Sequence, residues 1–272
     1  MQTFDVNGTT LTGLERGQGE LLILVHGAVG DWRSWEGVLD ALAQDYRVVT
    51  YSRRWHHPNP PHTDSATYTT DIHAKDLVAL ITACGGGPVR LLGHSYGAGV
   101  CTAVAAEQPG LVRCLVLAEP SLFGMAMTNP LGALALAQTA AATMHIVPLL
   151  KKGQPEKALS EFLLSIIGKE GYARLSPRAL AVMADNVNTL EPMLNGMSST
   201  LSFMGKQAAR VTPPTLLVEG EHTTTLFRAT MKALANAMPN AQRAVLPGVG
   251  HGLHLEDPAA FSRMALEFLA KH

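Results

Sequence analysis

A serine between glycines is the residue of this chain whose type and spacing best suit nucleophilic chemistry. Ser95 lies in the motif GHSYG at 93–97, which follows a short apolar run at 89–92 and precedes a run of small residues at 98–106. The first run has the length of a buried strand, and the second is typical of a helix. A serine on so tight a strand-to-helix turn is strained and exposes its Oγ at the helix N-terminus. The pattern predicts a nucleophile elbow, although a closely packed glycine turn without chemistry would have the same letters.

A serine hydroxyl is a weak nucleophile at neutral pH and needs an adjacent base. His251 is the candidate, because it lies in a glycine-rich loop just beyond the last apolar run, 241–246. Such loops lie at the carboxyl end of a parallel sheet, where ligand crevices form. His254 is the competitor, and its position favours packing at the start of the final helix instead.

The elements that must position these residues alternate between short apolar runs and amphipathic segments. This alternation predicts an α/β fold, with a mostly parallel sheet and helices on both of its faces. The hairpin signal at Asn7 and Gly8 predicts an antiparallel edge. The expected strands are 21–25, 46–51, 89–92, 112–118, 214–218 and 241–246. The expected helices that follow these strands are 34–44, 71–83, 98–106, 226–237 and 258–270.

The alternation stops in the middle of the chain. Residues 121–210 have no convincing strand, and we expect helices at 131–144, 156–167, 177–187 and 191–204. Crossovers between parallel strands are otherwise short, so this block predicts an insertion over one end of the sheet. The expected domains are a core formed by 1–120 and 211–272, and a helical cap (lid) formed by 121–210.

Three motifs in order give the chain a resemblance to a known family. His26-Gly27 follows an early strand, GHSYG stands in the middle, and Gly250-His251 follows the last strand. On these motifs the chain resembles the α/β-hydrolase family over nearly its whole length, in particular its small, lidded serine esterases and lactonases. The resemblance implies the α/β-hydrolase fold and a nucleophile, acid and histidine in that chain order.

The resemblance offers two places for the acid that orients the histidine. The first, after the strand that follows the elbow, is occupied by Glu119. At the second, after the next strand, the aspartate usual for the family is absent and threonines follow Glu221. Threonine cannot carry the charge that stabilises an imidazolium. Glu119 is therefore preferred, with Glu221 or Glu219 as the alternatives.

The resemblance also implies where the oxyanion of a tetrahedral intermediate would bind. In the family one donor is the backbone N–H of the residue after the nucleophile, here Tyr96. The other comes from the loop after His26-Gly27, here Ala28. His26 is expected to bond the backbone of its loop, and His94 is expected to point away from the nucleophile.

The implied activity is that of a cofactor-free serine hydrolase acting on a small carboxylic ester or lactone with an apolar portion. A serine at position 95 argues against epoxide hydrolases and dehalogenases of this fold, which need a carboxylate there. The remaining alternatives are a carbon–carbon bond hydrolase acting on a diketone, a perhydrolase, a less favoured hydroxynitrile lyase, and a receptor that hydrolyses its ligand slowly.

Composition restricts the partners. The 272 residues carry a net charge of −1 with no basic cluster, which argues against binding to nucleic acid. We expect no leader peptide, no apolar run approaching transmembrane length and no membrane partner, and hence a soluble, cytoplasmic protein. Cys84, Cys101 and Cys114 form no CxxC pair and are expected in the core without disulfides.

The sequence does not assign a catalytic role to three further groups of side chains: histidines, methionines and tryptophans. The histidines of the loop 52–68 lack an acidic or cysteine partner at ligand spacing, so no metal is expected. The methionines of 121–210 form either an adaptable pocket wall or the core of the cap. Trp32 and Trp35 would line the pocket mouth, or Trp35 would belong to the helix core. These histidines are His56, His57 and His62, and these methionines are Met125, Met127, Met144, Met193, Met197 and Met204.

Overall fold

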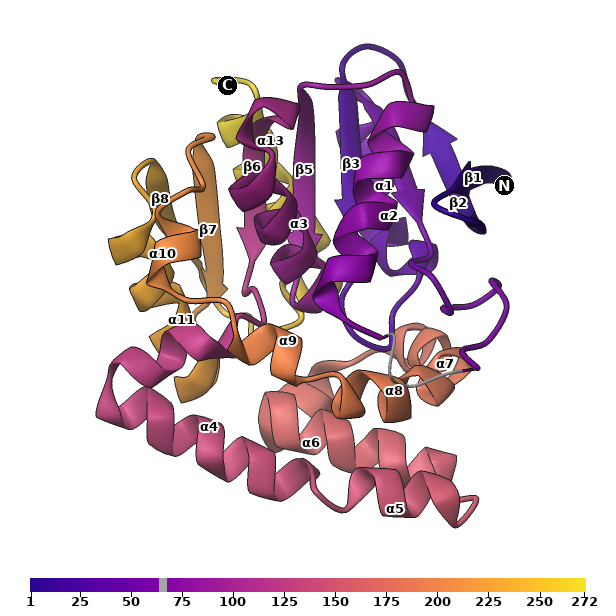
Figure 1. The fold of residues 1–272 in the computed structure, drawn as a ribbon, viewed down its shortest axis with the longest axis vertical. Coiled ribbons are helices and arrows are strands. Elements are labelled where there is room, and N and C mark those ends of the chain that lie inside the picture. The colour runs from indigo at the N-terminus through magenta and orange to yellow at the C-terminus, as the bar shows by residue number, and fades with distance from the viewer. Residues whose placement is uncertain (64–67) are drawn as a thin grey trace.

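An eight-stranded sheet forms the centre of the molecule (Figure 1). The computed structural model describes residues 1–63 and 68–272, so the predicted loop 52–68 lies partly outside the described residues. The strands are β1 (Gln2–Val6), β2 (Thr9–Arg16), β3 (Leu21–Val25), β4 (Arg47–Tyr51), β5 (Val89–His94), β6 (Val112–Ala118), β7 (Thr215–Gly220) and β8 (Ala241–Leu246).

The strand order is β1-β2-β4-β3-β5-β6-β7-β8. The pairs from β4 to β8 are parallel, whereas β1 pairs with β2 and β2 with β4 in the antiparallel sense. Asn7 and Gly8 turn between β1 and β2 with φ of 41° and 72°, as a two-residue hairpin turn with two positive φ angles requires. The predicted mostly parallel sheet with an antiparallel edge is confirmed.

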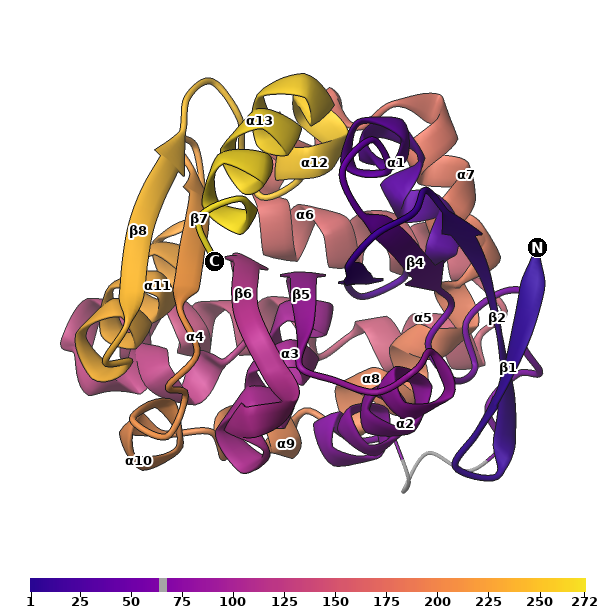
Figure 2. The ribbon, with the colours of Figure 1, turned by 90° about the horizontal axis from the view of Figure 1, so that it is seen from above.

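Helices cover both faces of the sheet because both faces are apolar (Figure 2). Alternate residues of a strand point to opposite faces. In β3, Leu22 and Leu24 pack with α1 (Glu36–Leu42) and α13 (Pro258–Leu269). Ile23 and Val25 belong to the opposite core, which also includes α2 (Thr70–Ala83), α3 (Tyr96–Glu107) and α11 (Thr225–Ala237). These continuous apolar strands are typical of a sheet that is buried on both sides.

The segment between β6 and β7, which we call the helical insert (residues 119–214), has no strand among the residues that the structure describes. Most of it lies below the sheet in Figure 1, beyond the carboxyl ends of the parallel strands, whereas its last helix, Gly205–Ala208, lies beside the sheet. Its helices are α4 (Pro130–Thr143), α5 (Ile146–Lys151), α6 (Pro155–Arg174), α7 (Pro177–Asp185), α8 (Leu190–Asn195), α9 (Ser198–Leu201) and α10 (Gly205–Ala208), and short 3-10 turns occur at Phe123–Thr128 and Val187–Thr189.

Several predicted helix boundaries are wrong. The helix expected at 191–204 is two short helices, α8 and α9, because the chain turns at Gly196, where a Cβ would overlap the Tyr68 carbonyl oxygen. Helix α6 continues past Gly168 to Arg174 with a kink, since that glycine has φ of 70°. The short helices α5 and α10 were not expected, because four to six residues carry little periodic signal.

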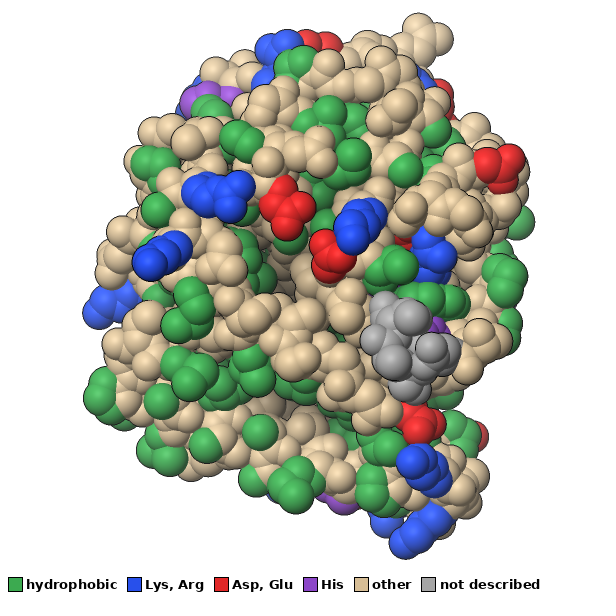
Figure 3. Space-filling view, in the orientation of Figure 1, with side chains coloured by type: hydrophobic (Ala, Val, Ile, Leu, Met, Phe, Trp, Pro, Cys, Tyr) green, Lys and Arg blue, Asp and Glu red, His purple; other side chains and the backbone are tan. Residues whose placement is uncertain are grey.

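Helices α4 and α5 correct another prediction. Pro130–Lys151 is a run of 22 residues that is long and apolar enough to cross a membrane by length and composition. Its most apolar window of 18 residues has a mean hydropathy of 1.5, and 11% of that window is buried. Leu131, Leu134 and Met144 are exposed along it, and apolar side chains line the lower edge of the molecule in Figure 3. The expectation that no apolar run approaches transmembrane length is therefore wrong for this segment.

Candidate active site

Ser95 stands on a strained turn between β5 and α3, with φ of 53° and ψ of −117°. The glycines around it are sterically required. A Cβ at Gly93 would lie 2.6 Å from the Ala98 Cα, and one at Gly97 would overlap the Val25 carbonyl oxygen. The strand, turn and helix therefore meet as closely as the sequence motif predicts.

Backbone strain is concentrated around Ser95. Five described residues other than glycine have positive φ, and three of them, Val29, Ser95 and Glu119, lie in the loops at the carboxyl ends of β3, β5 and β6. For a β-branched residue such as Val29 this conformation is a genuine outlier. Strain of this kind persists only where the surrounding structure imposes it, and it gathers at functional sites.

Glu119 and His251 are in direct contact. His251 Nδ1 lies 2.6 Å from Glu119 Oε2, and the carboxylate is fully buried. The same oxygen accepts from the Thr223 hydroxyl at 2.7 Å, and Oε1 accepts from the Gly220 N–H at 2.8 Å. The buried carboxylate thus has three hydrogen-bond donors, which hold it toward the imidazole.

The alternative acids have other partners. Glu221 Oε2 accepts from the Gly248 N–H at 2.8 Å, and Glu219 Oε1 accepts from Arg243 at 2.8 Å. Neither contacts His251. Thr223 belongs to the threonine run that lacks the usual aspartate, and its hydroxyl bonds Glu119 at the end of the neighbouring strand. Sequence reasoning missed this contact.

The imidazole of His251 is fixed by its neighbours. Phe227 stacks on it with ring centroids 4.0 Å apart. His94, whose pKa is lowered well below its usual value chiefly by burial, donates from Nε2 to the His251 carbonyl oxygen at 2.8 Å. The neutral His94 therefore helps to hold the loop that carries His251.

Glu256 holds the loop on both sides of this histidine. It accepts from the N–H groups of Gly250 and Gly252 at 2.9 and 3.0 Å. Arg174, at the end of α6, forms an ion pair with Glu256 at 3.1 Å and thereby connects the helical insert to the loop. Phe227 and Glu256 were not singled out in the sequence, where no motif marks them.

His254 lies apart from Ser95. Its ring packs 4.4 Å from that of the fully buried Trp35, and it does not line the cavity that contains Ser95. Burial, with the charge of His251 as the second cause, lowers its pKa to about 3. The structure places His254 in the core at the start of the last helices, and Trp35 is a core residue.

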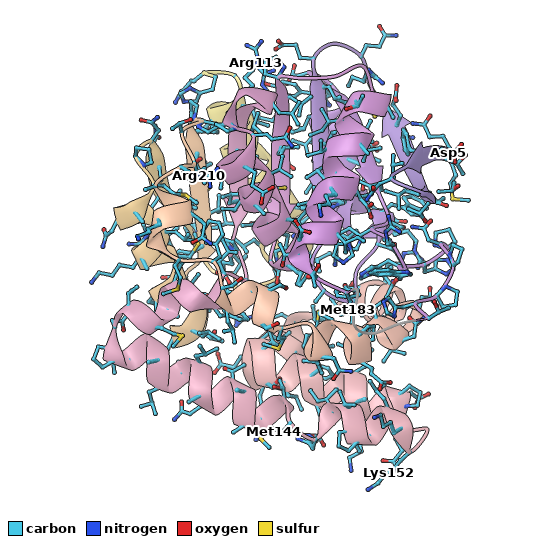
Figure 4. The ribbon with its side chains drawn as sticks, in the orientation of Figure 1. Asp5, Arg113, Met144, Lys152, Met183 and Arg210 are labelled. Atoms are coloured by element: carbon cyan, nitrogen blue, oxygen red, sulfur yellow. The ribbon has the colours of Figure 1, made fainter. Side chains whose placement is uncertain are left out.

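Ser95 and His251 both face an apolar cavity between the sheet and the helical insert. The cavity has a volume of about 880 Å³, part of it open to solvent. No Asp, Glu, Lys or Arg is among the described residues that line it. Three methionines contribute to its wall, Met183, Met193 and Met197, and Figure 4 shows Met183 at the boundary of the insert with the sheet.

The other methionines singled out in the sequence lie elsewhere. Met125 is buried in the core, whereas Met127, Met144 and Met204 are exposed. Both expectations for these methionines, pocket wall and core, therefore apply to only some of them. Met183 was missed because it lies on α7, among residues with no distinguishing motif.

Two residues that line the cavity have backbone N–H groups without an acceptor among the described residues. Among the described residues the Ala28 N–H has no hydrogen-bond partner, and Ala28 lines the cavity. Tyr96 is the first residue of α3, so its N–H has no acceptor within the helix. A Cβ at Gly27 would lie 3.1 Å from the Ser95 Cβ, which shows how closely the two loops approach.

The Ser95 hydroxyl has another serine as its partner. Its Oγ lies 3.1 Å from Ser121 Oγ, and the Ser121 N–H donates to the Ser95 carbonyl oxygen at 3.1 Å. In the described part of the chain, Ser95 Oγ makes no hydrogen bond to His251. The sequence did not single out Ser121, two residues beyond Glu119.

The histidines of the loop after β4 have structural partners. His56 is buried and bonds the Gly30 carbonyl oxygen at 2.7 Å and the Tyr68 hydroxyl at 3.0 Å. Within residues 1–63 and 68–272, no group of three His, Cys, Asp or Glu could hold a metal ion. The three cysteines are free and buried.

Comparison with known proteins gives the family. A family model described as the alpha/beta hydrolase family matches residues 22–264. An sn-1-specific diacylglycerol lipase of Mus musculus is 25% identical over 254 residues, which cover 92% of this chain and 80% of the lipase. A putative carbamate hydrolase of Stutzerimonas stutzeri is 28% identical over 258 residues, which cover 92% of this chain and 91% of that protein.

Similarity of structure agrees with these matches. The enol-lactonase of Burkholderia xenovorans has a TM-score of 0.80 over 99% of this chain and 100% of its own, at 18% identity. Epoxide hydrolases also occur among the similar proteins, so the fold alone does not decide which bond is cleaved. Because the family model spans most of the sequence, the chain belongs to the alpha/beta hydrolase family.

Proposed function

We propose that the chain is a serine hydrolase that cleaves a carboxylic ester or lactone with an apolar portion. The observation that carries the proposal is the 2.6 Å contact between the buried Glu119 and His251, beside Ser95 on its strained turn. In this proposal Ser95 is the nucleophile, His251 the general base and Glu119 the group that orients the histidine.

The geometry supports a two-step reaction. Glu119 accepts a hydrogen bond from the Nδ1–H of His251, which leaves Nε2 unprotonated and able to take the proton of Ser95 Oγ. Ser95 attacks the substrate carbonyl, and the Ala28 and Tyr96 N–H groups stabilise the oxyanion. His251 protonates the leaving alcohol and then activates the water that hydrolyses the acyl-enzyme.

The first step includes a rotation of the nucleophile. Ser95 Oγ is hydrogen-bonded to Ser121 Oγ in the resting structure, and we propose that it exchanges this partner for His251 by turning about χ1. Catalytic hydrogen bonds often form only in the complex with substrate. The helical insert covers the cavity, and we propose residues 121–210 as its cap.

The lining of the cavity defines the class of substrate. With no charged side chain in the described wall, a substrate carboxylate or ammonium would be buried without a partner. The proposed substrate is therefore uncharged around the carbonyl. The diacylglycerol lipase and the enol-lactonase compared above are named for the same two bond classes, an ester and a lactone.

The test is steady-state hydrolysis of p-nitrophenyl esters and lactones of increasing chain length, with Ser95→Ala as the control. We expect turnover that Ser95→Ala abolishes. We also expect an uncharged hexanoate to exceed the p-nitrophenyl monoester of a dicarboxylic acid of similar length by about 100-fold in kcat/KM, from the cost of burying an unpaired charge.

Three results would change the proposal. Equal rates for charged and uncharged esters would overturn the neutral substrate class. Turnover that persists in Ser95→Ala would overturn the nucleophile. Absence of turnover while an organophosphonate still labels Ser95 would replace ester hydrolysis by carbon–carbon cleavage or ligand sensing.

A further inference from the structure

Arg53, in the loop after β4, is a buried cation without an anionic partner. Its side chain is 1% exposed. Among the described residues no carboxylate contacts it, whereas the adjacent Arg54 pairs with Asp76 at 2.6 Å. A buried charge without a counterion is expensive, so its surroundings call for an explanation.

The donors of Arg53 converge on the loop that carries Ala28. Nη2 donates to the Gly27 carbonyl oxygen at 2.9 Å, and Nε donates to the His26 carbonyl oxygen at 3.2 Å. The guanidinium also lies 4.7 Å from the centroid of the Tyr96 ring. Arg53 therefore contacts the carbonyl of the Gly27–Ala28 peptide and the side chain of Tyr96.

His26 completes the contacts of the Gly27 carbonyl. Its Nε2 accepts the Arg53 backbone N–H at 2.9 Å, which leaves the proton on Nδ1, and Nδ1 lies 2.9 Å from the same Gly27 oxygen. Burial, and next the charge of Arg53, lower the pKa of His26 well below its usual value, so the ring is neutral. The Gly27 oxygen thus has one neutral and one cationic donor.

The Gly27 carbonyl and the Ala28 N–H belong to one planar trans peptide, so they point in opposite directions. A cation on the oxygen draws electron density from the peptide and makes the N–H a stronger donor. It also fixes the plane of the peptide, and with it the direction of the N–H. That N–H has no partner among the described residues and its residue lines the cavity.

We propose that Arg53 is a positioning residue of the oxyanion site, which acts through the Gly27–Ala28 peptide to strengthen and aim the Ala28 N–H donor. This inference rests on the proposed function for its kinetic consequence. The ligand it predicts for the site is the negatively charged oxygen of a tetrahedral acyl adduct.

The test compares Arg53→Met, which removes the charge and the donors, with Arg53→Lys, which keeps the charge but not the fork. Arg54→Met is the matched control, because it removes a neighbouring arginine from an ion pair without touching residues 26–28. For each we would measure kcat and KM for the best ester, and the Ki of an apolar boronic acid that forms a tetrahedral adduct with Ser95.

Loss of a direct oxyanion donor lowers kcat by about 100- to 1,000-fold. Because Arg53 acts through a peptide, we expect Arg53→Met to lower kcat by about 10- to 100-fold with KM changed less than about threefold. The boronate Ki should rise by the factor by which kcat/KM falls. Arg53→Lys should lie between Arg53→Met and wild type, and Arg54→Met should keep the wild-type kcat even if it lowers the melting temperature.

If Arg53 had a purely structural role, Arg53→Met would have a lower melting temperature, but boronate binding would not weaken relative to substrate binding. That result would overturn the proposal. If Arg53→Met does not fold, Arg53→Lys supports the same comparison of kcat, KM and Ki, and an unchanged kcat in that variant would overturn the proposal.

Nuclear magnetic resonance separates this inference from the proposed function. Loss of the Arg53 donor should move the Gly27 carbonyl ¹³C and Ala28 amide ¹⁵N resonances upfield, even if the wild type hydrolyses no ester. Unchanged resonances in a folded Arg53→Met protein would overturn the inference, whereas shifted resonances with no turnover would refute only the ester chemistry.

Discussion

Replacement of Glu119 by Gln tests the core of the proposed chemistry with a change of one atom. Glu119 has three buried donors, from His251, Thr223 and Gly220. A glutamine amide can accept on one side only. If its NH₂ faced Gly220, two N–H donors would oppose each other in the core, which costs about 1–3 kcal/mol for the unsatisfied group.

The amide oxygen will therefore face the Gly220 N–H, and the NH₂ will face Thr223 and His251. The Thr223 hydroxyl can rotate to accept, but His251 can accept at Nδ1 only by moving its proton to Nε2. Nε2 then cannot take the proton of Ser95. With His251 held in the tautomer that is protonated on Nε2, we expect kcat to fall by about 10⁴. This corresponds to a loss of about 5.4 kcal/mol of transition-state stabilisation.

The assay is steady-state ester hydrolysis, with the unfolding free energy measured alongside. Glu221→Gln is the control, since Glu221 is exposed and bonds Gly248 rather than His251. We expect it to retain the wild-type kcat within about twofold, as is usual for a surface substitution. The downfield proton resonance of His251 Nδ1 should disappear in Glu119→Gln. A Glu119→Gln variant that folds and keeps more than a tenth of the wild-type kcat would refute the assignment of the acid.

Burial lowers the pKa of His254 from 6.5 to about 3, so stability present above pH 6.5 is lost as the pH falls, by about 2 kcal/mol at pH 5 from this group. His254→Phe should reduce the difference in unfolding free energy between pH 7 and pH 5 in denaturant titrations, and an unchanged difference would contradict this cause. Ser121→Ala removes the hydrogen bond of about 0.5–1.5 kcal/mol that Ser95 Oγ makes in the resting structure. We expect phosphonylation of Ser95 to become about two- to tenfold faster, whereas a slower rate would mean that the Ser121 hydroxyl assists attack. In Gly97→Ala the new Cβ would overlap the Val25 carbonyl oxygen, so we expect loss of the folded protein in circular dichroism, and a stable variant would refute the steric reading of the motif.

The sheet could be predicted from the sequence because its signals are local. Apolar runs such as 21–25 and 112–118 have a strand's length and clear boundaries, and the structure has strands there. The helical insert was harder to divide, because its helices end at tertiary contacts. Gly196 breaks the predicted helix 191–204 where the chain meets Tyr68, and that contact spans more than a hundred residues of sequence.

The same distinction applies to the site. The sequence alone determined the serine turn, because glycine spacing reports a steric requirement of the backbone on neighbouring residues. It also limited the base to His251 or His254 and the acid to three glutamates. Only the tertiary structure decided which glutamate meets the histidine, since Glu119 and His251 are 132 residues apart and come together through the order of β6, β7 and β8.

Residues that act only through packed neighbours had no signal in the sequence. Arg53, Ser121 and Glu256 follow no motif spacing, and each gains its contacts from segments brought together by folding. Sequence patterns record what a residue does to its own backbone, whereas hydrogen bonds between loops depend on where the sheet places those loops. The candidate residues for the proposed chemistry were therefore readable from residue types and spacing, and their geometry was decided by the fold.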